Sequence, residues 1–173
     1  MRRQDKADRI GRMLDELYPN PPVPLDHTSP YTLLVAVALS AQATDVSVNA
    51  ATKALFEQVT TPAQMLALGE QQLKGFIKTI GLYNAKAANV IKAAQILVDE
   101  HGGEVPEGRV ALEALPGVGR KTANVVLQMY WGHPTIAVDT HVFRVSNRMG
   151  IAQGKTPDKV EDGLNRRVPD AFK

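Results

Sequence analysis

Apolar residues recur along the chain mainly at intervals of three and four positions, which is the period of a helix with one buried face. Residues 8–18 show this spacing first, and their apolar positions are Ile10, Met13, Leu14 and Leu17. Residues 31–39 are different, because they are apolar on every side and fit either a strand or a buried helix. Neighbouring alanines, and helical patterns before and after this segment, favour the buried helix.

Helix start and stop signals divide the rest of the chain. Thr44 and Thr61 are expected N-cap residues, and Gly81 and Gly102 are expected helix stops. Besides the two segments above, helices are predicted from Thr44 onward, over residues 62–68, 70–79, 83–101, 109–114 and 121–131, from Asp139 onward, and over 158–168. No segment alternates in the manner of a strand, so we expect an all-α protein of about nine or ten short helices.

A glycine-rich turn, Leu115-Pro116-Gly117-Val118-Gly119, separates two of these helices. Its two glycines can take backbone angles that are closed to other residues. Amide groups at the start of the following helix have no partner inside the helix, so they suit an anion such as a phosphate. Lys121 lies in the first turn, where the helix dipole disfavours an ammonium charge. A lysine there is a candidate for an uncharged nucleophile.

Each of these signals also has a plainer interpretation. Gly-x-Gly turns are common, and most lysines in a first helical turn are simply solvated. Residues 132–134 break the chain, an extended apolar segment follows, and Asp139 then stands where a helix N-cap is expected. The spacing alone leaves catalysis, solvation and capping open.

Two longer strings are more specific than the spacing. Residues 115–123 read L-P-G-V-G-R-K-T-A, and residues 134–145 read P-T-I-A-V-D-T-H-V-F-R-V. They resemble the helix-hairpin-helix and Gly/Pro-rich-Asp signature of base-excision DNA glycosylases, and within that superfamily the endonuclease III family. The resemblance extends to S-A-Q-A-T-D at residues 40–45 and I-G-L-Y-N-A-K-A at residues 80–87, so it covers nearly the whole chain.

The resemblance implies two helical lobes with a DNA-binding cleft between them. Residues 22–133 would form a helical barrel lobe, with the helix-hairpin-helix at about residues 109–131. Residues 1–21 together with 134–173 would form the second lobe. The implied activity is that of a DNA N-glycosylase and abasic-site lyase, which removes oxidised pyrimidines in base excision repair through a lysine Schiff base. Its partner would be double-stranded DNA that contains a damaged base or an abasic site.

The resemblance also assigns roles to single residues. Lys121 matches the family's nucleophile, and Asp139 matches a carboxylate that accepts a proton and stabilises charge on the sugar. Gln42 matches a side chain inserted into the gap left by a flipped nucleotide, and Leu82 matches an apolar wedge in the base stack. The expected phosphate or sugar contacts are Leu115, Gly117, Val118, Gly119, Arg120, Thr122, Thr140 and His141, with Arg144 and Arg148. The pattern alone favours the plainer interpretations, in which Gln42 is a loop residue and Leu82 makes a hydrophobic contact at a helix C-cap.

Composition limits the partners less than the motifs do. Lys and Arg number 20 against 18 Asp and Glu, so a DNA-binding face must come from the arrangement of charge. The chain has 0 Cys, which excludes disulfides and cysteine-ligated metals in these residues. Family members usually continue into a segment whose four cysteines hold a 4Fe-4S cluster. We therefore expect no cofactor and no metal here, in a chain that is truncated or belongs to a branch without the cluster.

No stretch has the length and apolarity of a membrane span, and the first residues lack the apolar core of a signal peptide. We expect a cytoplasmic protein, nucleoid-associated if it is bacterial, and a monomer. Where the cluster segment would lie in the family, we expect an exposed apolar patch that favours self-association. The residues expected in it are Ile10, Leu14, Leu17, Val160 and Leu164.

Two alternatives to a repair enzyme stand beside this prediction. One is a non-catalytic helix-hairpin-helix module that only binds DNA, and the other is an inactive truncated fragment. Lys121 and Asp139 speak against the binding module, since binding alone requires neither residue.

Overall fold

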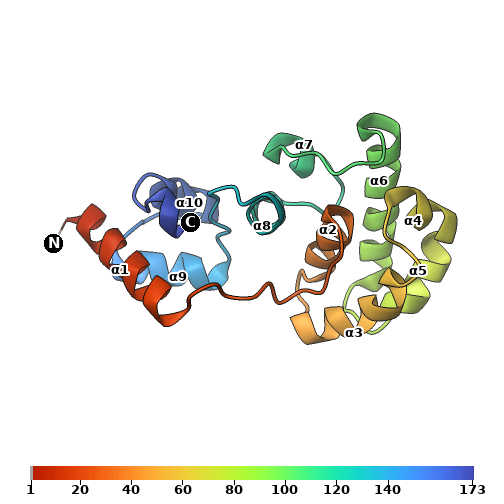
Figure 1. Ribbon diagram of the computed structural model, residues 1–173, viewed down its shortest axis with the longest axis horizontal. Coiled ribbons are helices and arrows are strands. Elements are labelled where there is room, and N and C mark those ends of the chain that lie inside the picture. The colour runs from red at the N-terminus through yellow and green to blue at the C-terminus, as the bar shows by residue number, and fades with distance from the viewer. Residues whose placement is uncertain (1) are drawn as a thin grey trace. The chain divides into compact units, whose positions relative to one another are not determined.

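The computed structural model describes residues 2–173, and within this range it consists of helices, turns and loops without a strand. The expected all-α fold is confirmed. The helices in Figure 1 are α1 Arg3–Leu17, α2 Pro30–Leu39, α3 Asp45–Phe56, α4 Pro62–Leu68, α5 Glu70–Ile77, α6 Tyr83–His101, α7 Arg109–Glu113, α8 Arg120–Trp131, α9 Thr140–Met149, α10 Pro157–Asn165 and the short 3-10 helix η1 Asp170–Phe172. Across residues 2–173, no helix combines the length and the apolar character that crossing a membrane requires.

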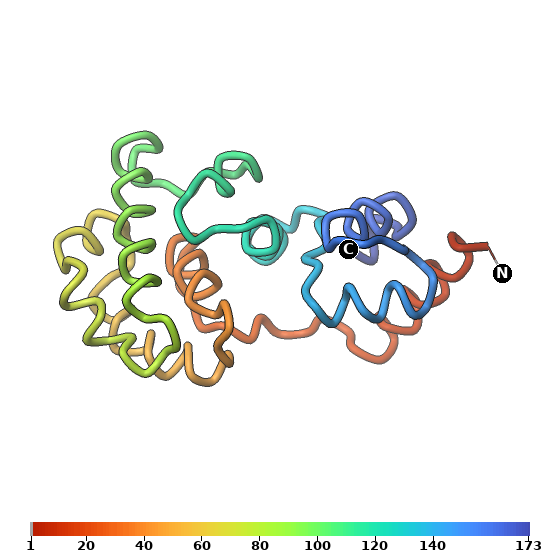
Figure 2. Tube along the Cα trace, turned by 180° about the vertical axis from the view of Figure 1, so that it is seen from behind, coloured from red at the N-terminus to blue at the C-terminus, as the bar shows by residue number. Residues whose placement is uncertain are grey.

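The chain divides into two compact units. The larger unit is continuous and covers Val23–Trp131, whereas the smaller unit combines Met1–Pro22 with Gly132–Lys173. In Figure 2, the smaller unit is made of the red segment near the N-terminus and the blue segment that leads to the C-terminus. The sequence-based expectation placed the two boundaries at residues 21/22 and 133/134.

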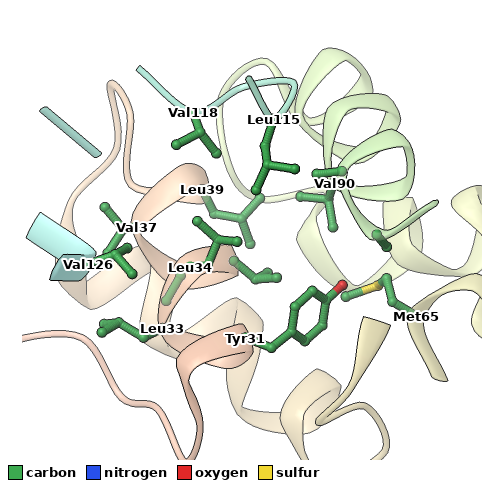
Figure 3. Packing of buried hydrophobic residues seen from close by; sticks show 14 of the residues in the cluster. Tyr31, Leu33, Leu34, Val37, Leu39, Met65, Val90, Leu115, Val118 and Val126 are labelled. Atoms are coloured by element: carbon green, nitrogen blue, oxygen red, sulfur yellow. The ribbon is translucent and has the colours of Figure 1, made fainter. Parts of the chain in front are cut away.

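Helix α2 is the central element of the larger unit. Its residues are apolar all round, so it has no polar face for water, and it packs against α3, α6 and α8. Ser29 caps its start by accepting a hydrogen bond from Thr32 N, and Pro30 takes the first helical position. Figure 3 shows Tyr31 and Leu34 of this helix among the buried side chains of the core. The ambiguous apolar segment is therefore the buried helix that we expected.

Local capping signals explain the ends of several other helices. The hydroxyls of Thr44 and Thr61 accept hydrogen bonds from backbone amides three residues later, at the starts of α3 and α4. Gly102 ends α6 with a φ of 61°, the left-handed conformation that glycine adopts without a steric cost. These three assignments are confirmed.

The predicted end of α5 is wrong. The helix ends at Ile77 rather than at Thr79, and Gly81 is not its stop. The chain turns early because Ile80 N donates a hydrogen bond to Ile77 O at 2.9 Å. This tight turn buries both isoleucine side chains in the core, which a regular helix continuing to Gly81 would not require.

The predicted end of α10 is also wrong, since the helix stops at Asn165 rather than at Val168. Val168 precedes Pro169, and the proline ring disfavours the helical conformation in the residue before it. The chain closes instead with turn-like hydrogen bonds, in which Val168 N donates to Leu164 O at 2.7 Å.

Helix α1 begins at Arg3, well before the predicted start at residue 8. The apolar period did not reveal this first turn because the residues in it are polar. The Asp5 carboxylate accepts a hydrogen bond from Arg2 N at 3.2 Å, and its charge is favourable near a helix start.

The smaller unit has a small apolar core, whose members are Ala7, Val138, Ile151, Ala152, Val160 and Leu164. Polar bonds add to it, because Lys6 Nζ donates to Met149 O at 2.7 Å and Gln4 Nε2 donates to Arg167 O at 2.6 Å. Gly11 allows η1 to approach α1 closely, since a Cβ atom at this position would lie 2.5 Å from the Phe172 ring.

The expected apolar patch is only partly correct. Val160 and Leu164 are buried in the small core, so they cannot belong to an exposed patch. Ile10 is half-buried and packs against that core. The exposed apolar residues of this unit's first segment are Met13, Leu14, Leu17 and Tyr18, which we call the α1 patch.

Candidate active site and nucleic-acid interface

Helices α7 and α8 and the turn between them form the helix-hairpin-helix in the larger unit. The turn is held by two short-range hydrogen bonds, from Leu115 N to Leu112 O at 3.0 Å and from Val118 N to Leu115 O at 3.1 Å. The first bond of α8 runs from Ala123 N to Gly119 O at 2.9 Å. Amide groups before Ala123 therefore point out of the helix start, where an anion can accept hydrogen bonds from them.

Gly117 is required by the shape of this turn. Its φ is 80°, and a Cβ atom at this position would lie 3.1 Å from the Cβ of Asn89. A larger residue would therefore suffer both an unfavourable backbone conformation and a close contact with α6.

Leu115 and Val118 anchor the turn by their side chains. They are 2% and 6% exposed and belong to the core of the larger unit, as Figure 3 shows. Both were expected among the DNA contacts, and their buried side chains leave the backbone as the part of each residue that can contact DNA. The exposed Gly117 and Gly119 offer open backbone beside them.

Lys121 is the second residue of α8 and lies on its exposed side. Ala123 and Asn124 turn the opposite side of the helix into the core. Within residues 2–173, the Lys121 side chain makes no hydrogen bond or ion pair, so its amine is available to a ligand. Arg120 and Thr122 on either side of it are half-buried.

Asp139 belongs to the smaller unit and caps α9. Its Oδ1 accepts hydrogen bonds from His141 N at 2.9 Å and from Val142 N at 2.8 Å, which confirms the expected N-cap. Both bonds go to one oxygen, so Oδ2 has no partner among residues 2–173. The carboxylate can therefore hold the helix start with one oxygen and accept a proton with the other.

Gln42 and Leu82 share an unusual backbone conformation. Their φ values are 56° and 60°, and both side chains are exposed. The left-handed region costs an ordinary residue about 1–2 kcal/mol, and such residues cluster at functional sites. Sequence reasoning chose both positions but missed this conformation, and Leu82 proves to precede α6 rather than to end a helix.

One cavity brings several of the chosen residues together within the larger unit. Its volume is about 250 Å³, and Gln42, Leu82, Gly117 and Val118 all line it. Three further polar side chains in its wall, Tyr31, Lys86 and Asn89, were not among the sequence-based candidates. The Tyr31 hydroxyl is buried without a hydrogen-bond partner among residues 2–173, and burial raises its pKa.

A basic face on α9 forms a second candidate contact surface. His141, Arg144, Val145 and Arg148 are exposed and line a hollow of about 170 Å³. These positions follow the three- and four-residue spacing of one helix side. Thr140, at the start of the same helix, is also exposed.

The residues of this chain do not fit a 4Fe-4S cluster. A cluster of this kind takes cysteine thiolates as ligands, and the 173 residues contain 0 Cys. Within residues 2–173, no group of three or more His, Cys, Asp or Glu side chains is placed to hold a metal ion.

Comparison with known proteins now places the chain in a family. Residues 35–170 match the family model described as HhH-GPD superfamily base excision DNA repair protein. The chain therefore belongs to the HhH-GPD superfamily, and within it to the endonuclease III family. This makes it a base-excision DNA repair enzyme, with DNA glycosylase and abasic-site lyase activity.

The similar proteins are endonuclease III enzymes, known from both sequences and solved structures. Endonuclease III of Escherichia coli strain K12 is 60% identical over 98% of this chain and 81% of its own length. Endonuclease III of Haemophilus influenzae is 58% identical over 97% of this chain and 80% of its own. A solved structure, a trapped endonuclease III–DNA covalent intermediate in an estranged-adenine complex, matches with a TM-score of 0.91 and 43% identity, over 98% of this chain and 80% of that one.

Proposed function

We propose that this chain removes oxidised pyrimidines from double-stranded DNA and cuts the abasic site that remains, with Lys121 as the nucleophile. The observation that carries the proposal is the position of this lysine. It is exposed, free of partners among residues 2–173, and lies in the first turn behind the glycine turn. The solved relative named as a trapped covalent intermediate with DNA supports a nucleophilic mechanism.

The first half of the proposed reaction removes the base. The Lys121 amine attacks C1′ of the deoxyribose, and the new C–N bond replaces the bond to the damaged base, which leaves with the electron pair and takes up a proton. The amine loses a proton, the sugar ring then opens between C1′ and its ring oxygen, and the oxygen gains a proton. The product is a protonated imine between Lys121 and C1′.

The second half cuts the strand. A proton leaves C2′, a double bond forms between C2′ and C3′, and the 3′ phosphate leaves with the electron pair of its C–O bond. Water then adds to the imine and releases the lysine amine together with the unsaturated sugar. These steps use a lysine, a carboxylate and water, so we propose that no cofactor takes part in them.

Asp139 supports the attack in this proposal. Its Oδ2 accepts the proton that the amine loses, and its charge stabilises the positive charge that develops on the sugar. The bonds to Oδ1 leave Oδ2 for this role.

Gln42 and Leu82 are proposed to fill the duplex where the nucleotide leaves the stack. Extrusion costs unstacking energy, and a wedge that fills the gap offsets part of it. Leu82 is 64% exposed, which suits a side chain that enters the base stack. The Gln42 amide has donors and an acceptor for the orphaned base.

The glycine turn and the basic face of α9 are proposed to hold phosphates. Open amides at a helix start are common anion ligands, and arginine pairs well with phosphate. We propose that the protein acts as a monomer in the cytoplasm.

Borohydride trapping tests the proposal directly. Duplexes that contain an oxidised pyrimidine, an oxidised purine or a pre-formed abasic site are incubated with the protein, and borohydride reduces any imine to a stable crosslink. We expect crosslinks on the first and third duplexes and little on the second.

Lys121→Gln should abolish both crosslinking and strand cleavage, because an amide cannot form the imine. It should still bind abasic DNA through the turn amides. Lys92→Gln, at an exposed lysine of α6, controls for the loss of one charge and should behave like the parent. Crosslinking by Lys121→Gln would refute the assignment, whereas binding without cleavage by the parent would favour the non-catalytic module.

A further inference from the structure

Lys86 is a buried lysine that the proposed reaction does not use. It is only 8% exposed and lies in the first turn of α6, in the wall of the 250 Å³ cavity. Its ammonium Nζ donates a hydrogen bond to Leu39 O at 2.9 Å. Its backbone N donates a second one to Leu82 O at 3.0 Å.

These two bonds connect the segments that carry Gln42 and Leu82. Leu39 is the last residue of α2, and the turn with Gln42 follows it directly. Leu82 is the residue before α6. The backbone bond is the first helical bond of α6, which any residue at this position would make. The side-chain bond is specific to Lys86, and it ties Leu39, three positions before Gln42, to the first turn of the helix that begins after Leu82.

The core supports the Gln42 turn on one side only. Ala43 packs against the core, whereas Gln42 is exposed and lines the cavity. Inside the turn, the hydrogen bond from Ala43 N to Ser40 O at 3.0 Å fixes the local shape. It does not reach α6, whereas the Lys86 ammonium ties the last residue of α2, directly before the turn, to α6.

Stability alone does not explain a lysine at this position. Removing an ammonium from water is costly, and burial lowers the pKa of Lys86. An apolar side chain of similar length would avoid this cost, although it would leave Leu39 O without its bond. The ammonium also lies at the end of α2, where the helix dipole favours a positive charge. The hydrogen bond has a definite direction, so it can fix a geometry that apolar contacts would leave loose.

We propose that Lys86 is a positioning residue, which holds the Gln42 turn and Leu82 at the relative placement needed to extrude a nucleotide. This inference rests on the proposed function of Gln42 and Leu82. Lys86 touches neither the sugar nor the base in this scheme. It acts before bond breaking, and its loss slows extrusion while leaving the chemistry of Lys121 intact.

The test compares two substrates with the same protein. Lys86→Met keeps the length of the side chain and removes its charge and donor. Base excision from a duplex should fall by about 10- to 100-fold under single-turnover conditions, which is the range that a small misplacement produces. Cutting and crosslinking of a pre-formed abasic site should fall by much less, because such a site has no base to unstack. Lys92→Met, on the exposed side of the same helix, should match the parent on both substrates.

A second comparison separates positioning from a general loss of structure. If Lys86 acts through Leu82, then Lys86→Met should add little to the defect of Leu82→Ala in a double variant, because both changes impair one step. If Lys86 only stabilised the fold, Lys86→Met would lower the rates on both substrates equally. In the double variant, its effect would then add in full to that of Leu82→Ala. Either of these results, or a Lys86→Met protein with parental rates, overturns the inference.

Lys86→Arg keeps the inference testable if the methionine variant does not fold. A guanidinium retains a donor for Leu39 O but holds it at a different distance from the α6 backbone. Lys86→Arg should restore folding but still slow base excision more than it slows the cutting of a pre-formed abasic site. If both rates fell by the same factor relative to the parent, the positioning role would be contradicted. A failure of the proposed function looks different, because the parent itself would then form no borohydride crosslink.

Discussion

The two units of this protein differ in how their functional residues are supported. The core of the larger unit draws buried side chains from every helix between α2 and α8, and Leu33 and Leu112 in it are fully buried. The core of the smaller unit is one short cluster, and polar bonds from Lys6 and Gln4 help to hold α1 to it. Lys121, Gln42 and Leu82 thus lie on or next to helices that the larger core holds, whereas Asp139 caps a helix in the unit with the smaller core.

This difference shows two ways to place a reactive group. In the larger unit, the buried side chains of α2 and α6 fix the chain on either side of the cavity, and the left-handed residues Gln42 and Leu82 lie beside these helices. In the smaller unit, the carboxylate is fixed by its own hydrogen bonds to the start of α9. We therefore expect that substitutions of reactive groups will change activity with little change in stability. Substitutions of core residues should change the free energy of unfolding, and by different amounts in the two units.

Among the variants that test this comparison, Asp139→Asn should have the largest effect. Asparagine is an equally good N-cap, so the free energy of unfolding should change by less than about 0.5 kcal/mol. Base excision should fall by roughly 10²–10⁴-fold, the usual effect of losing an acid–base group. Single-turnover assays and denaturant unfolding measure the two quantities. Asp15→Asn, an exposed carboxylate of the same unit, is the control. If Asp139→Asn lost stability but kept activity, Asp139 would be a cap only.

Matched truncations compare the packing of the two cores. Leu33→Ala in the larger unit should lower the free energy of unfolding by about 3–5 kcal/mol, because the surrounding core cannot collapse into the cavity. Leu164→Ala in the smaller unit should cost less, about 2–3 kcal/mol, because a less densely packed site relaxes more easily. Denaturant titrations followed by circular dichroism give both values. A larger loss for Leu164→Ala would reverse the comparison.

Leu82→Gly should separate stability from activity within the larger unit. Glycine adopts the left-handed conformation without strain, and little buried area is lost at a 64% exposed position. We expect a gain of up to about 1 kcal/mol in the free energy of unfolding. Base excision should nevertheless slow by about tenfold, because the Leu82 side chain no longer fills the base stack. We expect a similar slowing in Leu82→Ala and in Gln42→Ala.

Leu82→Ala serves as the control for Leu82→Gly, since it removes the wedge without relieving the strain. Cutting of a pre-formed abasic site should suffer less in each of these variants. Equal losses on both substrates would mean that Gln42 and Leu82 act through the fold or through general affinity for DNA.

A smaller effect is expected from the buried hydroxyl of Tyr31. Burial raises its pKa in the folded protein, so above the ordinary value of about 10 the unfolded chain loses this proton first. Stability should therefore be full below about pH 10 and fall as the pH rises further. In Tyr31→Phe, the free energy of unfolding should fall less steeply above pH 10. At neutral pH, the substitution should lower it by at most about 1 kcal/mol. Unfolding of the two proteins between pH 8 and 11 measures the difference, and parallel curves would contradict it.

The smallest effect on stability is expected at the α1 patch. Replacing Leu14 and Leu17 by Gln should change the free energy of unfolding by no more than about 0.5 kcal/mol each, because both are more than half exposed. Self-association at high concentration and binding of a hydrophobic dye should both decrease. Sedimentation measures the first, and a parent protein that is strictly monomeric and binds no dye would remove the basis for this prediction.

Local signals in the sequence were sufficient for much of this fold. Thr44, Thr61 and Asp139 cap helices through bonds to amides two or three residues away, and such bonds depend on neighbouring residues alone. The ends of α5 and α10 were missed because burial of Ile80 and the proline after Val168 competed with helix propensity.

The candidate site was predictable only in part. Lys121 and Asp139 lie in strings specific enough to be chosen from sequence, and their proposed roles remain predictions. The left-handed conformations of Gln42 and Leu82, and the bond from Lys86 to Leu39 O, depend on contacts across the fold. Lys86 and Leu39 are 47 residues apart, and no periodic pattern connects them.

The bond between Lys6 and Met149 has a consequence for the order of folding during synthesis. Helix α1 leaves the ribosome before this partner, which follows it 143 residues later. At 5–20 residues per second, α1 waits for about 7–30 s, and its Ala7 and Ile10 side chains, which pack into the small core of the folded protein, are open to chaperones in the meantime. The continuous larger unit can fold during that interval, so the carboxylate of Asp139 is the last of the proposed catalytic groups to be installed.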